Sequence, residues 1–250
     1  MKIFVGKDKK SGDKEAFRII KKQILNKPSS LIGLAVGKTT DGLYNLINKS
    51  ALKIPLFWRN IKLFQIDENL GFGPGSSLSF NREIKNELKN LLKIIKRNNI
   101  FLIDGSKKPK KIIEEGYTFI RKNNGIDLMI LGLGPEYDPH IAYNTSGKST
   151  LKSGFRAVDL HPKIAKKILK KNRRLKGITL GIKDILEVKK VLLIAYGKEK
   201  AISLELALMK KVDIKKASAS ALQFHKNLEI VIDKAASSKL LRDIQSFHVQ

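Results

Sequence analysis

Short apolar runs alternate along the chain with longer stretches in which apolar residues recur at helical spacing. The apolar runs predict five strands, Leu31–Val36, Ile61–Ile66, Ile126–Leu131, Val191–Ala195 and Glu229–Ile232. The helical spacing predicts helices over Asp13–Asn26, Ser79–Asn98, Ile112–Asn123, Lys163–Lys171 and Lys200–Met209. Continuous apolar runs are typical of strands buried on both faces, as in a parallel sheet. The pattern therefore predicts a doubly wound α/β fold, a mainly parallel sheet flanked by helices, and a single domain over residues 1–250.

The composition of the chain is that of an ordinary globular protein. Its 250 residues are 42% hydrophobic, which is enough for a sizeable core. The chain has no cysteine, which excludes disulfides, thiolate metal sites and a cysteine nucleophile, and fits a reducing compartment. The apolar segment within Met1–Lys10 is too short for a signal peptide, and no run has the length of a membrane-spanning helix. We therefore expect a soluble cytoplasmic protein that makes no membrane contact.

The formal net charge of +27 makes nucleic acid the first partner to consider. Two features argue against it. The lysines are spread through nearly every segment, and aromatic residues are not interleaved with them as a stacking platform would require. We interpret the charge as a solvated surface that favours anionic substrates by electrostatic steering, and we do not expect nucleic acid as a partner.

Polar or glycine-rich segments follow four of the predicted strands. They are GKTT after the first, DENLGFGPGSS after the second, GLGPEYDPH after the third and GKEK after the fourth. In open α/β sheets, ligands bind outside the carboxyl ends of the strands. The four segments together therefore predict a ligand site at that edge of the sheet.

The first of these loops, VGKTTDGLY over Val36–Tyr44, has the residue types of a phosphate-binding loop. A nucleotide P-loop needs four residues between its first glycine and its Gly-Lys pair, whereas three separate Gly33 from Gly37. The P-loop interpretation is therefore excluded. A helix that begins near Thr40–Gly42 would still direct backbone N–H groups at an anion, although an ordinary strand-to-helix turn is the alternative. The segment GLGPEY lacks the third glycine of a dinucleotide fingerprint, so we expect no such cofactor.

Candidate acid–base groups stand in the next two segments. Asp67 and Glu68 form a carboxylate pair directly after a buried strand, where partial burial would raise the pKa of a base; a helix cap or salt bridge is the alternative. Asp138 stands two residues before His140 and could orient and charge its ring. Lys200, at the entry to a helix, could close over a bound phosphate as a point charge. We interpret the remaining histidines, His161, His225 and His248, as structural. We expect no bound metal, because no two histidines have the spacing of metal ligands.

The same segments resemble, in order, the motifs of the glucosamine-6-phosphate deaminase family, which is related to the 6-phosphogluconolactonases. VGKTTDGLY resembles T-G-x-T-P-x-G-x-Y, and IDENLGF is similar to the family's Asp-Glu motif. GLGPEYDPHIAYNTSG resembles G-x-G-x-D-G-H-I-A-F-N-E-P. GITLGIKDILEVKKVLLIAYGKEKA resembles the stretch that leads to a phosphate-binding lysine, and ASASALQFHKNLEIVIDKAAS resembles the C-terminal Ser-x-Leu-Gln-x-His segment. The five matches span nearly the whole chain.

This resemblance implies conversion of glucosamine 6-phosphate to fructose 6-phosphate and ammonia. Asp67 would be the base that moves a proton between C2 and C1 of the opened sugar, and His140, with Asp138 as its partner, would assist ring opening. The resemblance also implies a small-molecule sugar phosphate as ligand, no cofactor, no metal, and a homo-oligomer as one form of the protein. The residues implied to bind the phosphate are Gly37, Lys38, Thr39 and Lys200.

The chain departs from the family's pattern in three places. Three residues separate Gly134 from Asp138, where the family has one, and Pro139 replaces a glycine, so this loop is longer and stiffer. Thr145 stands where the family has a glutamate that helps to set the charge of the histidine. In the phosphate loop, Val36 replaces a threonine, Lys38 replaces a small residue and Thr40 replaces a proline.

Two other functions stay open at this point. One is a 6-phosphogluconolactonase-type hydrolase, whose Gly-x-Gly-Pro-Asp-Gly-His loop shares Pro135, although GITLGI, SALQFH and Asn69 after the Asp-Glu pair favour the deaminase. The other is a sugar-phosphate-binding homologue with little catalytic activity, which the change at Thr145 and the altered loop would fit.

Overall fold

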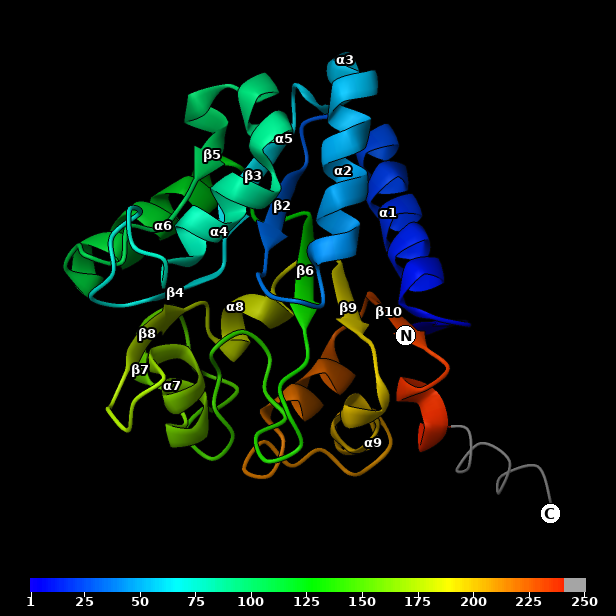
Figure 1. Ribbon diagram of the computed structural model, residues 1–250, viewed down its shortest axis with the longest axis vertical. Helices are drawn as coiled ribbons and strands as arrows, with labels where there is room; N and C mark the ends of the chain where they lie inside the picture. Colours follow the sequence, from blue (N-terminus) through cyan, green and yellow to red (C-terminus); the bar gives the residue numbers. More distant parts are fainter. Residues whose placement is uncertain (241–250) are drawn as a thin grey trace.

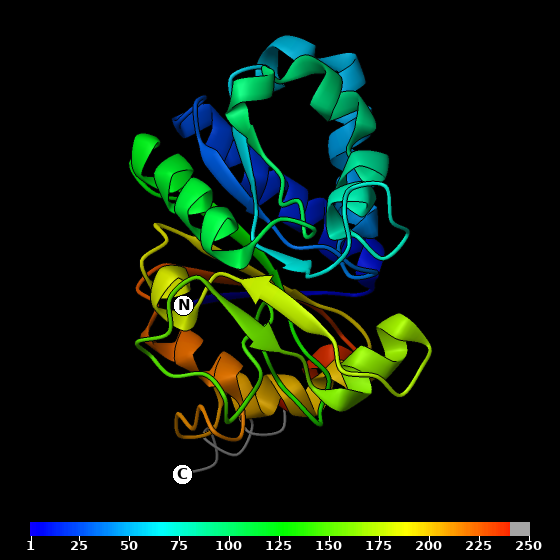
Figure 2. The same ribbon diagram turned by 90° about the vertical axis from the view of Figure 1, so that its left-hand side faces the viewer.

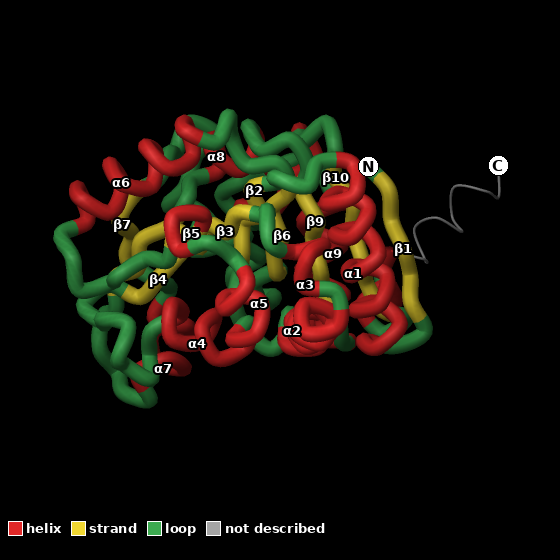
Figure 3. The backbone as a smooth tube through the Cα atoms, turned by 90° about the horizontal axis from the view of Figure 1, so that it is seen from above, coloured by secondary structure: helices red, strands yellow, loops and turns green. Residues whose placement is uncertain are grey.

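A parallel sheet forms the centre of the molecule in the computed structural model, which describes residues 1–240. Within those residues the sheet has seven strands, and every neighbouring pair is parallel. Figure 3 shows them in a row with helices on both sides. From one edge to the other, the strands are β1 (Lys2–Gly6), β10 (Leu228–Asp233), β9 (Val191–Ala195), β6 (Leu128–Gly132), β2 (Leu31–Leu34), β3 (Lys62–Gln65) and β5 (Ile100–Phe101).

Each central strand contributes side chains to two hydrophobic cores, one on each face of the sheet. In β9, for example, Leu193 packs into one core while Leu192 and Ile194 pack into the other. This two-sided burial explains why the strands read as unbroken apolar runs. The helices of one face are α1 (Lys9–Asn26), α2 (Asp41–Lys53), α3 (Pro55–Trp58), α4 (Phe80–Glu87) and α5 (Lys89–Ile94). Those of the other face are α6 (Pro109–Lys122), α8 (Ile182–Leu186), α9 (Ala201–Leu208) and the 3₁₀ segment Ser218–Phe224 (Figure 1).

A second, three-stranded antiparallel sheet lies beside the main one and faces the viewer in Figure 2. Its strands are β4 (Asp67–Asn69), β8 (Lys176–Thr179) and β7 (Arg156–Asp159), and α7 (Pro162–Leu169) packs on it through a small core of its own. The chain passes from the main sheet to this one within two residues, because β3 ends at Gln65 and β4 begins at Asp67. Asp67 therefore lies at the junction of the two sheets.

The predicted fold class is confirmed, and all five predicted strands are present with ends that differ by up to two residues. The single helix predicted over Ser79–Asn98 is wrong, because the chain breaks at Leu88 and the helical part ends at Ile94. The second of the two helices, α5, is capped by a residue of another helix. The side chain of Asn48, on α2, accepts hydrogen bonds from the N–H groups of Asn90 (2.8 Å) and Leu91 (3.2 Å). Such a cap is a tertiary contact.

None of the described helices is both long and apolar enough to cross a membrane. That the whole chain, residues 1–250, forms one domain stays a prediction.

Candidate functional site

The carboxyl ends of β2, β3, β6, β9 and β10 meet at one edge of the sheet and border two neighbouring cavities. The first, here the Asp67 cavity, has a volume of about 150 Å³ and is lined by Asp67, His140, Gly134 and Tyr143 among others. The second, the Lys200 cavity, measures about 310 Å³ and is lined by Lys200 together with Lys9, Lys38, Tyr196, Gly197, Glu199 and Asp233. Thr39 borders both. A larger cavity of about 580 Å³, near Leu70, Leu169 and Arg173, includes none of the predicted site residues.

Asp67 is a buried carboxyl group that the fold leaves partly unpaired. Its side chain lines the Asp67 cavity, the residue is 6% exposed, and its Oδ1 atom has no hydrogen-bond partner. Burial raises the pKa of Asp67 to about 8, with further contributions from the negative charges of Glu68 and Glu83. A carboxyl group with a pKa near neutrality and a free oxygen toward a cavity suits a general base.

Glu68, its neighbour, has the opposite environment. It is fully buried and accepts hydrogen bonds at both oxygens from donors around the start of α4, so that it caps this helix. Of the two carboxylates, Glu68 thus serves as the helix cap, whereas Asp67 faces the cavity. The donors to Glu68 are the N–H groups of Asn69 (2.7 Å), Phe80 (2.8 Å) and Asn81 (2.8 Å), the Ser79 hydroxyl (2.9 Å) and the Gln65 amide (3.1 Å).

The lengthened loop from Gly134 to His140 folds back on itself and still brings His140 to the Asp67 cavity. The Gly134 N–H donates to the His140 carbonyl (2.8 Å), and a Cβ atom at Gly134 would lie 2.6 Å from His140 Nδ1. Only glycine fits here. From the other side, the Ala219 N–H donates to the Pro139 carbonyl (3.0 Å), so the C-terminal 3₁₀ segment holds the loop in place.

Asp138 and His140 form a pair within this loop. His140 Nδ1 lies 3.1 Å from Asp138 Oδ2, and the other Asp138 oxygen accepts the Ser146 N–H at 2.8 Å. Burial by itself would raise the pKa of Asp138, but the hydrogen bond and charge of His140 and the Ser146 N–H outweigh it and hold the pKa below its usual range. The buried Asp138 carboxylate, which is 1% exposed, therefore holds the His140 ring in position.

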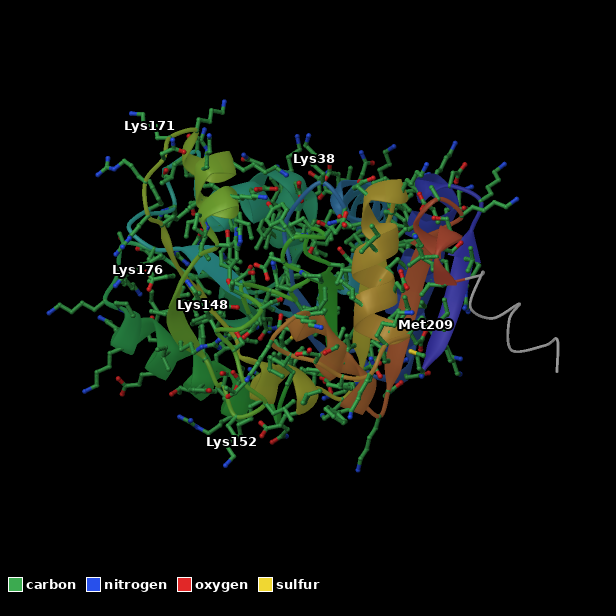
Figure 4. The ribbon with its side chains drawn as sticks, turned by 90° about the horizontal axis from the view of Figure 1, so that it is seen from below. Lys38, Lys148, Lys152, Lys171, Lys176 and Met209 are labelled. Carbon is green, nitrogen blue, oxygen red and sulfur yellow. The ribbon has the colours of Figure 1, made fainter. Side chains whose placement is uncertain are left out.

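The loop after β2 is a tight turn that leads directly into α2. Gly37 has a φ of +131°, and its carbonyl accepts both the N–H and the side-chain hydroxyl of Thr40 (2.9 Å each). The buried Tyr44 hydroxyl donates to the Ala35 carbonyl (2.5 Å) and anchors the turn to the helix. Lys38, by contrast, is exposed and projects outward (Figure 4). The turn thus presents Gly37, Lys38 and Thr39 around the start of a helix, which is a geometry suited to an anion.

Lys200 lies between the two cavities. Its ammonium group donates to the Leu133 carbonyl (2.5 Å), which borders the Asp67 cavity, while Lys200 itself lines the other one. Burial lowers the pKa of Lys200; Glu199 opposes this and Lys167 adds to it. The turn before Lys200 is fixed because Asp233, at the end of β10, accepts the Gly197 N–H (3.0 and 3.1 Å).

Thr145 does not border the Asp67 cavity. It lines a separate cavity of about 230 Å³ with Lys148, Ser149 and Arg156. Arg156 is held there by Ser149 Oγ (2.8 Å) and by Asn144 Oδ1 (3.0 Å). The structure therefore brings Asp67 and the His140–Asp138 pair together, and it brings Lys38, Thr39 and Lys200 to one cavity with Gly37 next in the chain, but it leaves position 145 to one side.

The other predicted features are structural or lie outside the described residues. His225 Nε2 lies 2.8 Å from the Val188 carbonyl, His161 caps α7, and His248 lies outside residues 1–240. Among the described residues, no group of three or more acidic or histidine side chains has the arrangement to hold a metal ion. The sequence interpretation missed Lys9 on the wall of the Lys200 cavity, because nothing about a lysine at the start of a helix distinguishes it from the many others.

Comparison with known proteins gives a consistent result. A sequence model of the family described as glucosamine-6-phosphate isomerases/6-phosphogluconolactonase matches residues 10–230. A Clostridium novyi (strain NT) protein named glucosamine-6-phosphate deaminase is 32% identical, over 96% of this chain and 100% of its own. A protein of that name from Mycoplasmopsis pulmonis (strain UAB CTIP) is also 32% identical, over 95% and 94%.

Solved structures show the same fold. A monomeric glucosamine-6-phosphate deaminase superimposes with a TM-score of 0.86 at 24% identity, over 96% of this chain and 100% of that one. The 6-phosphogluconolactonase from Trypanosoma brucei superimposes with a TM-score of 0.76 at 18% identity, over 96% and 98%.

Proposed function

Because this chain belongs to the family of glucosamine-6-phosphate isomerases and 6-phosphogluconolactonases, we propose that it converts glucosamine 6-phosphate to fructose 6-phosphate and ammonia. One observation carries the proposal. The partly unpaired Asp67 carboxyl group and His140, which is paired with Asp138 behind it, line one small cavity, and a cavity lined by lysines adjoins it. Aldose–ketose isomerisation needs a base and a ring-opening acid–base group at a fixed distance from a phosphate anchor.

The reaction follows from these groups in three steps. His140, held by Asp138, transfers the proton of the C1 hydroxyl to the ring oxygen, and the sugar ring opens. Asp67 then takes the proton from C2 and delivers it to C1, while a proton passes from the amine to the C1 oxygen, so that the aldehyde with an amine at C2 becomes a hydroxyl at C1 and an imine at C2. Water adds to that carbon and ammonia leaves, so that one sugar phosphate and one water give fructose 6-phosphate and ammonia.

The phosphate group of the substrate would lie in the Lys200 cavity. The turn of Gly37, Lys38 and Thr39 offers donors at the start of α2, and Lys200 supplies a positive charge beside both cavities. The half-buried Lys200 is already oriented by the Leu133 carbonyl, which limits the entropy lost on binding.

The lactonase alternative places different demands on the same site. A lactone hydrolase needs a base for water beside the carbonyl carbon but no proton transfer at C2, so an unpaired Asp67 meets the need for a base in either reaction. The fold is shared with lactonases, and the 32% identity with proteins named glucosamine-6-phosphate deaminase favours the isomerising deaminase. A sugar-phosphate binder without turnover would need neither group.

The test is to incubate the purified protein with glucosamine 6-phosphate and to measure ammonium and fructose 6-phosphate. We expect both products in equal amounts. Hydrolysis of 6-phosphogluconolactone without ammonium release would support the hydrolase instead, and binding of the sugar phosphate without any product would support the binder. A cytoplasmic location, a homo-oligomeric form, independence of cofactors and the lack of a nucleic-acid partner stay predictions.

A further inference from the structure

Lys9 lines the Lys200 cavity although it belongs to none of the sequence motifs. It is the first residue of α1, and β1, which precedes it, pairs with β10 and so brings the start of α1 to the edge where Gly197 and Asp233 lie. Its ammonium group lies 2.8 Å from Asp13 Oδ2 and 5.3 Å from the centre of the Tyr196 ring. Lys9 is therefore held by a carboxylate on one side and an aromatic face on another.

Asp13 is a buried carboxyl group with one oxygen that has no hydrogen-bond partner. It is 5% exposed, Lys9 is its hydrogen-bond partner at Oδ2, and its Oδ1 atom has no hydrogen-bond partner in the structure. A buried carboxylate with an unsatisfied oxygen is destabilising. Burial raises the pKa of Asp13, and the hydrogen bond and charge of Lys9 oppose this shift. What the arrangement achieves is a fixed position for the Lys9 ammonium group.

That position is directly at the start of α2. A Cβ atom on Gly42, in the first turn of the helix, would lie 1.9 Å from Asp13 Oδ2 and 2.9 Å from the Lys9 ammonium nitrogen. The Lys9–Asp13 pair thus packs against the same helix N-terminus that follows the Gly37–Thr39 turn. An ammonium group has three N–H donors, and Asp13 occupies one of them.

We propose that Lys9 is a third phosphate-binding lysine, positioned by Asp13, and that it contributes more to phosphate affinity than Lys38 does. The inference rests on the proposed function, which places the phosphate in the Lys200 cavity. Lys200 and Lys9 are both held before any ligand arrives, by the Leu133 carbonyl and by Asp13. Lys38 is exposed, and its side chain makes no hydrogen bond or ion pair within residues 1–240, so it must be ordered on binding, which offsets part of its attraction.

The experiment measures the affinity of inorganic phosphate by titration calorimetry for the wild type and five variants. Lys9→Gln and Lys200→Gln are each expected to weaken phosphate binding about tenfold, the loss of one hydrogen bond to a charged group. Lys38→Gln is expected to weaken it about twofold. Lys10→Gln is the matched control, because Lys10 is exposed on the same helical turn and the substitution removes the same charge. Lys9→Arg, which keeps the charge, is expected to retain most of the affinity.

Three outcomes decide the matter. A Lys9→Gln variant that binds phosphate as Lys10→Gln does, while Lys200→Gln loses affinity, overturns this inference and leaves the proposed function standing. A larger loss in Lys38→Gln than in Lys9→Gln overturns the ranking. A wild type that neither binds phosphate nor releases ammonium from glucosamine 6-phosphate overturns both proposals. Thermal unfolding of each variant shows that the fold is intact, and the KM for the sugar phosphate should rise in Lys9→Gln while kcat stays within about twofold.

Discussion

The two neighbouring cavities differ in whether their charged groups have hydrogen-bond partners within the protein. In the Asp67 cavity, the carboxyl group of Asp67 keeps one oxygen without a hydrogen-bond partner, and its pKa rises to about 8. In the Lys200 cavity, the ammonium groups of Lys9 and Lys200 each have an oxygen acceptor that fixes them. A base must be free to take a proton, whereas a binding cation works best when it is already in place. The difference separates the reacting part of the site from the anchoring part.

The largest effect is expected from Asp67→Asn. If Asp67 is the proton-transferring base, the amide cannot replace it, and kcat should fall by about 10³-fold. The affinity for inorganic phosphate should stay the same, because the Lys200 cavity is unchanged. Steady-state kinetics and phosphate titration of the same preparation check both halves. Turnover that survives this substitution would remove Asp67 from the mechanism and erase the distinction between the two cavities.

Glu68→Gln should act on stability instead of chemistry. The amide N–H2 of the glutamine would face N–H and O–H groups that donate to the carboxylate in the wild type, so the cap of α4 would be lost. We therefore expect the free energy of unfolding to fall by about 3 kcal/mol. Urea unfolding measures it. Glu115→Gln is the control, since its ion pair with Lys107 is exposed and should change stability by less than about 0.5 kcal/mol. Equal stability of both variants would contradict the cap.

Asp138→Asn should lower kcat by about 10²-fold and leave the KM nearly unchanged. An asparagine can still contact the His140 ring but removes the negative charge beside it, and it does not touch the Lys200 cavity. A change confined to the KM would mean that the loop serves binding, which would merge the two cavities into one functional unit.

The smallest effect is the pH dependence. With a pKa of about 8, Asp67 in the free protein is ionised in about a tenth of molecules at pH 7, so kcat/KM should rise about tenfold per pH unit up to pH 8 and then level. Because the folded state raises the pKa of this carboxyl group, it holds a proton that the unfolded chain has released. Its contribution to stability is therefore lost as the pH rises from about 4 to about 8.

Comparing the wild type with Asp67→Asn at several pH values isolates the contribution of the Asp67 carboxyl group. The variant should lack that part of the pH dependence of unfolding, which urea titrations at pH 5 and pH 9 would reveal. A kcat/KM profile that is flat between pH 6 and pH 8 would show that Asp67 ionises well below 8 in the working protein.

The sequence predicted what local patterns encode. Strands β2, β3, β6, β9 and β10 are apolar on both faces, and that pattern needs no knowledge of neighbours. Strand β1 was missed because it lies at the edge of the sheet with most of its residues exposed. The second sheet was missed because its strands are short and partly polar, and their pairing is set by contacts distant in sequence.

The site divides in the same way. Asp67 and Glu68 were found as a pair, but the sequence could not tell which one faces a cavity, since that depends on where α4 begins. The segment Gly134–His140 was located by its residues, although its path depends on the Ala219 N–H far along the chain. Lys9 carries no signal at all, because its place is set by the pairing of β1 with β10.

That pairing of β1 with β10 also dictates the order of assembly during synthesis. Residues 2–6 are made long before their neighbour in the sheet, residues 228–233. Until then the first strand has no partner, and the wall that Lys9 shares with Asp233 does not exist. In a nascent chain, this wall of the anion site therefore cannot form before residues 228–233 have been made.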